Sequence, residues 1–153
     1  MRIWFWITNK SEARLDCATE PLHLLPGVLK RHGGEVTELL RRADTLLVPV
    51  LPSPIDMRAA TRFIAELLKS GRISRGQTRI GLIANRVREN TRIYHALEDF
   101  LSEYDIPLLT HLRESQNYIR AAETGLGIFE LAPSQVAPDV VQWDPVIEWL
   151  RKG

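Results

Sequence analysis

Cysteine is almost absent from this sequence. The 153 residues contain one thiol, that of Cys17. A single thiol forms no intramolecular disulfide and cannot supply a cluster of thiolate metal ligands. We therefore expect a protein of a reducing compartment, the cytoplasm.

Long apolar runs and an excess of charge are also lacking. No run approaches the roughly 20 apolar residues of a membrane span, and the apolar residues 1–8 are too few for a signal peptide. The net charge of +1 creates no overall field toward nucleic acid or lipid. We expect no membrane partner, and any basic partner surface must be local.

Residue groups typical of metal or hydrolase chemistry do not appear either. The four histidines are scattered without the spacing of metal ligands: His23, His32, His95 and His111. No carboxylate pair and no Ser/His/Asp arrangement stands out. The sequence therefore predicts no metal site and no catalytic residue of these classes.

What is present is an alternation of strand-like and helix-like segments. Continuous apolar runs predict strands over residues 3–7, 45–51, 79–84 and 106–112. Helical spacing predicts helices over residues 28–43, 55–70, 90–104 and 115–123, and a terminal helix that begins at Asp139 or Asp144. Residues 9–27 show no sustained period. This order predicts one α/β domain over residues 1–153, with a mostly parallel sheet and helices on both faces.

Helix ends carry candidate capping residues. Ser53 or Asp56 is expected to cap the helix over 55–70, and Gly71 to stop it. Asn90 and Ser115 are expected to open the next two helices. Pro49 predicts that the strand over 45–51 leaves the sheet before its end.

Ligands of parallel sheets bind beyond the carboxyl ends of the strands. The loops at that edge are predicted to be residues 49–56, 85–90 and 111–117. Most of the distinctive polar residues of the chain fall in these loops.

Four ordered motifs occur around these loops, where h denotes an apolar residue. Residues 43–56, ADTLLVPVLPSPID, follow the pattern AD-x-h-h-h-P-h-x-P-S-x-x-D. Residues 80–87, IGLIANRV, place Asn-Arg directly after an apolar run. Residues 106–113 read IP-h-h and end in Arg, and residues 118–125 read Y-x-x-A-x-x-x-G. Over residues 36–131 the chain resembles the ParA/MinD-type partition ATPases.

This resemblance implies a partial P-loop NTPase-like fold, with ATP and Mg²⁺ as cofactors. It also implies segregation of plasmids, chromosomes or another cargo. Nonspecific DNA, a partition partner protein and a second copy of the chain are the implied partners.

The phosphate-binding loop of the family is missing from the sequence. No G-x-x-x-x-G-K-[ST] or K-G-G-x-G-K-T occurs. Such a loop holds the phosphates through backbone amides and lysine, so its loss removes most stabilisation of phosphoryl transfer. The resemblance thus predicts a truncated domain without the N-terminal P-loop portion, unable to hydrolyse ATP alone.

The family's D-T-P-[AG] element is also altered. Its best match is Leu24-Leu25-Pro26-Gly27, which places Leu24 where the metal-linked aspartate stands. Asp16-Cys17-Ala18 is the alternative match. The chain is therefore expected to be a degenerate paralogue or a truncated reading frame.

The resemblance assigns five cofactor-binding candidates: Pro52, Asp56, Asn85, Arg86 and Arg113. An asparagine side chain both donates to and accepts from an adenine edge, although Asn85 also suits a strand-end turn. Asp56, like Ser53, is explained equally by helix capping. Arg113 suits a phosphate or a partner subunit, and equally a solvated loop.

Arginines form the candidate DNA surface, in two stretches: Arg72, Arg75 and Arg79, then Arg86, Arg88 and Arg92. Acidic residues lie between them, and no aromatic residues alternate with them as a base-stacking platform requires. Backbone electrostatics is the only DNA mode that they support.

The sequence thus predicts a ParA-like partitioning protein without ATPase activity of its own. Two alternatives stay open. One is an active nucleotide hydrolase or ATP-dependent enzyme of the superfamily with another phosphate site. The other is a nonfunctional remnant.

Overall fold

The structure is a computed structural model, and it describes residues 6–8 and 43–152. Several predictions lie outside these residues. They are the strand residues 3–5, the segment 9–27 with both aspartate matches, and nearly all of the helix over 28–43.

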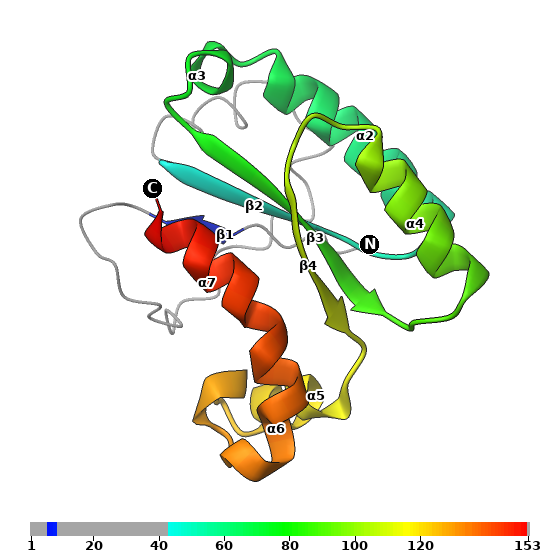
Figure 1. Ribbon diagram of the computed structural model, residues 1–153, viewed down its shortest axis with the longest axis vertical. Helices are drawn as coiled ribbons and strands as arrows, with labels where there is room; N and C mark the ends of the chain where they lie inside the picture. Colours follow the sequence, from blue (N-terminus) through cyan, green and yellow to red (C-terminus); the bar gives the residue numbers. More distant parts are fainter. Residues whose placement is uncertain (1–5, 9–42, 153) are drawn as a thin grey trace.

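A four-stranded sheet in the order β1-β2-β3-β4 forms the centre of the fold (Figure 1). Its strands are β1 (Trp6–Thr8), β2 (Thr45–Val50), β3 (Arg79–Val87) and β4 (Leu108–Arg113). β2, β3 and β4 are parallel, whereas β1 runs antiparallel to β2. The predicted α/β class with a mostly parallel sheet is confirmed, and β1 is its antiparallel exception.

Helices connect the strands and follow them. They are α2 (Pro54–Leu68), α3 (Gly71–Ser74), α4 (Arg92–Ser102), α5 (Gln116–Glu123), α6 (Pro133–Val140) and α7 (Asp144–Arg151), with short 3-10 turns η2 (Ile128–Glu130) and η3 (Val141–Trp143). α2 and α4 lie on one side of the sheet and α7 on the other (Figure 1). Helices therefore cover both faces, as predicted.

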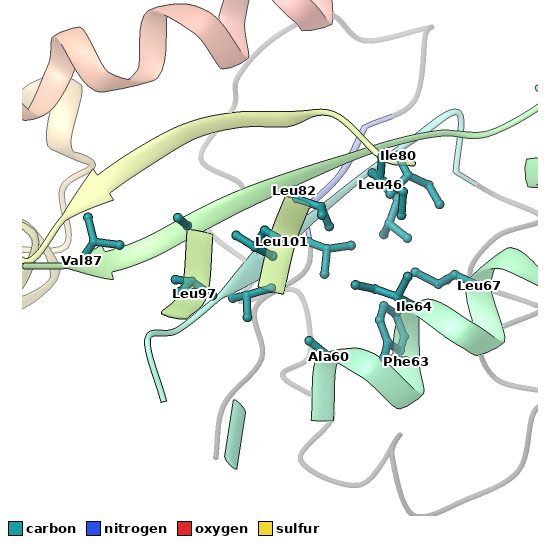
Figure 2. Close-up of a cluster of buried hydrophobic side chains, with 14 residues drawn as sticks. Leu46, Ala60, Phe63, Ile64, Leu67, Ile80, Leu82, Val87, Leu97 and Leu101 are labelled. Carbon is teal, nitrogen blue, oxygen red and sulfur yellow. The ribbon is translucent and has the colours of Figure 1, made fainter. Parts of the chain in front are cut away.

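The main core lies between the sheet and the α2/α4 layer. Leu82 of β3 packs there with Ile64 and Leu67 of α2 and with Leu97 and Leu101 of α4 (Figure 2). These five side chains are at most 1% exposed. The apolar positions of both helices, three and four apart, form the stripe that faces the sheet.

A smaller core lies on the opposite face. Leu47, Ile83 and Leu112 come from the three parallel strands and pack against Val146 of α7. Each strand thus places apolar side chains on both faces, as buried parallel strands require. This explains why their sequences are continuous apolar runs.

Several predicted boundaries were wrong. β3 continues through Val87, so Asn85 and Arg86 belong to the strand and not to a loop. Pro49 is still paired, opposite Ile83 of β3. α2 ends at Leu68, and Gly71 begins α3 and does not stop α2.

Helix starts were predicted with mixed success. Ser53 is the N-cap of α2 by position, but its side chain makes no capping hydrogen bond. Thr91, and not Asn90, caps α4 through its side chain. Ser115 caps α5 as predicted, and Asp144 is the first residue of α7. Asp139 lies inside α6, a helix that the sequence pattern did not predict.

Candidate functional site

An open cleft of about 420 Å³ lies at the carboxyl ends of the parallel strands. Its lining comes from Leu51, Pro52, Ser53, Asp56, Arg86, Arg88, Thr91, Ile93 and Glu114. All three loops predicted at this edge contribute to it, after β2, after β3 and after β4. Parallel strands bring these loops together because their carboxyl ends share one edge of the sheet.

The first turns of two helices border the cleft. Ser53 and Asp56 belong to the start of α2, and Thr91 and Ile93 to the start of α4. Thr91 donates its hydroxyl to the carbonyl of Arg88 at 2.8 Å and accepts from the amide of Tyr94 at 3.3 Å. Helix N-termini carry partial positive charge, so both helices favour an anion here.

Glu114 joins two arginines across the cleft. Its Oε1 accepts from Nη2 of Arg86 at 2.9 Å, and its Oε2 accepts from Nε of Arg88. The Glu114 amide donates to the carbonyl of Val87 at 2.9 Å, which fixes the backbone beside β3. Hydrogen bonds from Arg86 and then Arg88 lower the pKa of Glu114 and keep it ionised.

Arg86 has a backbone conformation unusual for its residue type. Its φ is 53°, in the left-handed region that only a few per cent of non-glycine residues occupy. Backbone strain of this kind concentrates at functional sites. The bend lies where the pairing of β3 with β4 shifts register between Asn85 and Val87.

Asp56 contributes a carboxylate with one buried, unsatisfied oxygen. Its Oδ1 is buried and has no hydrogen-bond partner among the described residues. Asp56 also lines a water-sized pocket of about 10 Å³ beside β2. A buried acceptor without a donor is costly, so this oxygen suits a hydrogen-bond donor of a ligand.

Three cofactor-binding candidates, Pro52, Asp56 and Arg86, therefore share one cleft. The other two, Asn85 and Arg113, are not part of its lining. Asn85 lies in β3 opposite Leu112 and is half-buried. The nucleotide roles of all five remain predictions.

Arg113 has a buried partner. Its Nε donates to Oδ1 of Asp139 at 2.6 Å, and the Asp139 side chain is 0% exposed. Asn117 Nδ2 and Ser115 Oγ donate to the other carboxylate oxygen at 2.6 and 3.2 Å. Burial alone would raise the pKa of Asp139, but these hydrogen bonds outweigh it and lower the pKa. Arg113 therefore anchors α6 to the end of β4.

The predicted DNA-binding arginines lie at opposite ends of β3. Arg79 begins the strand, donates to the carbonyl of Trp149 at 2.7 Å and stacks 4.0 Å from its ring centroid. Arg72 donates to the hydroxyl of Thr78 at the same end. Arg88 and Arg92 follow the other end, roughly 30 Å away at the usual rise of a strand. The two stretches do not form one continuous patch.

A second polar cluster lies where α4 faces β4. The Tyr94 hydroxyl donates to Oε1 of Glu98 at 2.6 Å, and Nε2 of His111 lies 3.4 Å from the same oxygen. The hydrogen bond to Glu98 raises the pKa of Tyr94 to about 12 and lowers the pKa of Glu98. Within residues 6–8 and 43–152, no three His, Cys, Asp or Glu side chains are grouped to hold a metal ion.

Sequence reasoning missed Glu114 and Asp139 as site residues. Glu114 lies in a loop that was predicted to border the site, but nothing local marks it as the partner of two arginines. Asp139 was interpreted only as a helix start.

In the part of the chain described here, no helix has the length and apolar character needed to cross a bilayer.

Comparison with known proteins gives one informative similarity. No family model matches the chain. The chain is 30% identical over 95 residues to the "Maintenance of carboxysome distribution protein A" of Halothiobacillus neapolitanus. The match covers 61% of this chain and 44% of that protein, so the chain spans less than half of its length. This similarity supports the ParA/MinD-type resemblance of the sequence motifs.

Proposed function

We propose that this chain is a ParA-like partitioning protein that acts in the segregation of plasmids, chromosomes or another cargo. The observation that carries the proposal is the 30% identity, over 95 residues, to a protein named for carboxysome distribution. Two further observations support it. The ParA-like resemblance extends over residues 36–131, and its motifs between residues 43 and 113 lie on parallel strands whose carboxyl ends share one edge of the sheet.

ATP and Mg²⁺ are the proposed cofactors, with contacts from Pro52, Asp56, Asn85 and Arg86. The unpaired Asp56 oxygen fits a hydrogen-bond donor of the ligand, and the basic side of the cleft fits its anionic part. The 153 residues nevertheless contain no P-loop lysine motif. We therefore propose weak nucleotide binding and no ATP hydrolysis by the chain alone.

Calorimetric titration with ATP and Mg²⁺, together with a phosphate-release assay, tests this proposal. We expect affinity no better than about millimolar, since most nucleotide affinity comes from phosphates held at a loop, and no turnover. Asn85→Ala is expected to weaken any binding. Gln77→Ala removes an exposed amide at the opposite end of β3 and serves as the matched control.

Phosphate release by the purified chain would instead support the second candidate, an active nucleotide hydrolase. Micromolar affinity that depends on Asn85 would contradict the loss of the nucleotide site. If the purified chain binds no nucleotide, no DNA and no partner protein, the third candidate, a nonfunctional remnant, is left.

Nonspecific DNA, a partition partner protein and a second copy of the chain are the proposed partners. Fluorescence anisotropy with a short duplex at several salt concentrations tests the DNA contact. Because the arginines lie at two ends of the sheet, two double variants separate them: Arg72→Gln with Arg75→Gln, and Arg88→Gln with Arg92→Gln. We expect only one of the two double variants to reduce the slope of DNA affinity against salt concentration. The reduction should correspond to about two phosphate contacts. Equal loss from both pairs would contradict a DNA surface at one end.

A further inference from the structure

The cleft already contains an anion of the protein itself. Glu114 accepts from Arg86 at 2.9 Å and from Arg88. The side chains of these arginines stay 62% and 75% exposed, so both keep donors that face solvent. Glu114 therefore occupies only part of the hydrogen-bonding capacity of the two guanidinium groups.

Two helix N-termini near the clamp formed by Arg86, Arg88 and Glu114 favour negative charge, whereas the Asp56 carboxylate, which also lines the cleft, opposes it. The N-termini of α2, a helix of 15 residues, and of α4, a helix of 11 residues, both border the cleft. Each contributes partial positive charge from its free backbone amides. The Ser53 side chain makes no capping bond, so it leaves the amides at the start of α2 to other acceptors.

The backbone presents the two arginines in a fixed way. The left-handed Arg86 lies at the end of β3, where the register with β4 shifts. The Thr91 hydroxyl holds the carbonyl of Arg88 at 2.8 Å. Both arginines therefore start from a defined backbone position, and their planar guanidinium groups lose little entropy per hydrogen bond to an oxyanion.

We propose that Arg86 and Arg88 form a binding site for a small phosphate-bearing ligand, and that Glu114 is the resident carboxylate that this ligand displaces. Guanidinium groups match phosphate oxygens as well as carboxylate oxygens, so the two anions compete for the same donors. The cleft of about 420 Å³ lies in the size range of small-molecule sites. The inference rests on the proposed function only in treating this cleft as a ligand site.

Displacement makes Glu114 a determinant of affinity. Glu114 holds Nη2 of Arg86 and Nε of Arg88, so a phosphate that takes these same donors must break both contacts. Exposed ion pairs are individually weak, so the Glu114 carboxylate lowers the affinity for phosphate moderately and does not prevent binding. Removal of its charge should therefore tighten phosphate binding, which is the opposite of what loss of an ordinary lining residue does.

Pyrophosphate is the suitable probe, because it has the phosphate chemistry without a base. Calorimetric titration is carried out on the wild type, Glu114→Gln, Arg88→Gln and Glu66→Gln. Glu66→Gln removes one negative charge from an exposed position of α2 outside the cleft and is the matched control. Unfolding midpoints in urea confirm that all four proteins are folded.

We expect Glu114→Gln to bind pyrophosphate about threefold to fivefold more tightly than the wild type. Glu66→Gln should bind like the wild type, and Arg88→Gln at least about threefold more weakly. Equal affinity of Glu114→Gln and Glu66→Gln would overturn the exchange, and so would absence of binding by both at millimolar pyrophosphate.

The same phosphate chemistry could come from a DNA backbone, so the four proteins are also titrated with a DNA duplex. If Glu114→Gln tightens duplex binding and leaves pyrophosphate binding unchanged, the small-ligand site is wrong and the surface contacts a DNA backbone. The outcome is separable from that of the proposed function. Tighter pyrophosphate binding without any Asn85-dependent ATP binding would keep the anion site and reject the nucleotide site.

Discussion

Nε of Arg113 lies 2.6 Å from Oδ1 of Asp139, and the carboxylate of Asp139 is completely buried. The pair joins the last residue of β4 to α6, which lies 26 residues later in the chain. Gln142 reinforces the same junction, since its Oε1 accepts from the amide of Arg113 at 2.9 Å. The end of β4, which borders the cleft through Glu114, is thus held from the C-terminal side.

Replacement of Asp139 by asparagine should destabilise the fold. Asp139→Asn keeps the size of the side chain but leaves Arg113 without its anion and turns acceptors into a donor group. We expect a loss of about 1–3 kcal/mol in the free energy of unfolding, measured with urea. Asp99→Asn on the exposed face of α4 is the matched control and should change it by less than about 0.5 kcal/mol. Equal effects of the two would mean that the network does not stabilise the junction.

Stability should also depend on Asp139 at acidic pH. The pKa of Asp139 is lower in the folded chain than in the unfolded chain. A lowered pKa contributes stability above the unfolded value, about 3.9, and that stability is lost as the pH falls through the folded value. We expect the urea midpoint of the wild type to fall below about pH 4 more steeply than that of Asp139→Asn. Parallel curves would contradict this linkage.

Much of the sheet could be predicted from the sequence. The apolar runs over 45–51 and 79–84 correspond to β2 and to most of β3, because strands buried on both faces need apolar residues at every position. Both ends of α5 were predicted, since Ser115 is a strong N-cap signal within the segment itself. Local signals sufficed wherever the cause of the structure was local.

The C-terminal region shows where local signals fail. α6 contains Pro133 and Pro138, and proline usually argues against a helix interior. Pro133 is tolerated in the first turn, and the helix buries Val136 and Asp139. The partners of Asp139 lie 22 to 26 residues away, so no sequence window contains the reason for its burial.

The candidate site was predicted in its position and not in its contacts. Parallel topology alone brings the carboxyl ends of β2, β3 and β4 together, so Pro52, Asp56 and Arg86 lie at one edge. The clamp of Glu114 depends on the left-handed backbone of Arg86 and on a register shift. Neither property follows from residue types.

The cluster at Glu98 predicts an unusual tyrosine titration. The hydrogen bond that Tyr94 donates to Glu98 raises the pKa of Tyr94 to about 12. A raised pKa means that the associated stability is present below the unfolded value, about 10, and is lost as the pH rises through the folded value. We expect ultraviolet absorbance to show one tyrosine that ionises near pH 12, and Tyr94→Phe to remove that step. Glu98→Gln should shift the step to lower pH.

Tyr118 serves as an internal reference for this experiment. Tyr118 also has a raised pKa, mainly because it is buried. Its titration should not respond to Glu98→Gln, since its side chain accepts from Trp143 and lies elsewhere. If the highest step persists in Tyr94→Phe, the assignment to Tyr94 is wrong.

Adjacent leucines at the end of α2 provide a direct test of the core. Leu67 is 0% exposed and packs against the sheet, whereas Leu68 is 47% exposed. Leu67→Ala should lower the free energy of unfolding by about 2–5 kcal/mol, because it removes apolar contacts and leaves a cavity. Leu68→Ala makes the same chemical change at a solvent-facing position and should cost less than about 1 kcal/mol. Urea unfolding of both variants measures these losses. Comparable losses of unfolding free energy in the two variants would mean that α2 does not face the sheet as Figure 2 shows.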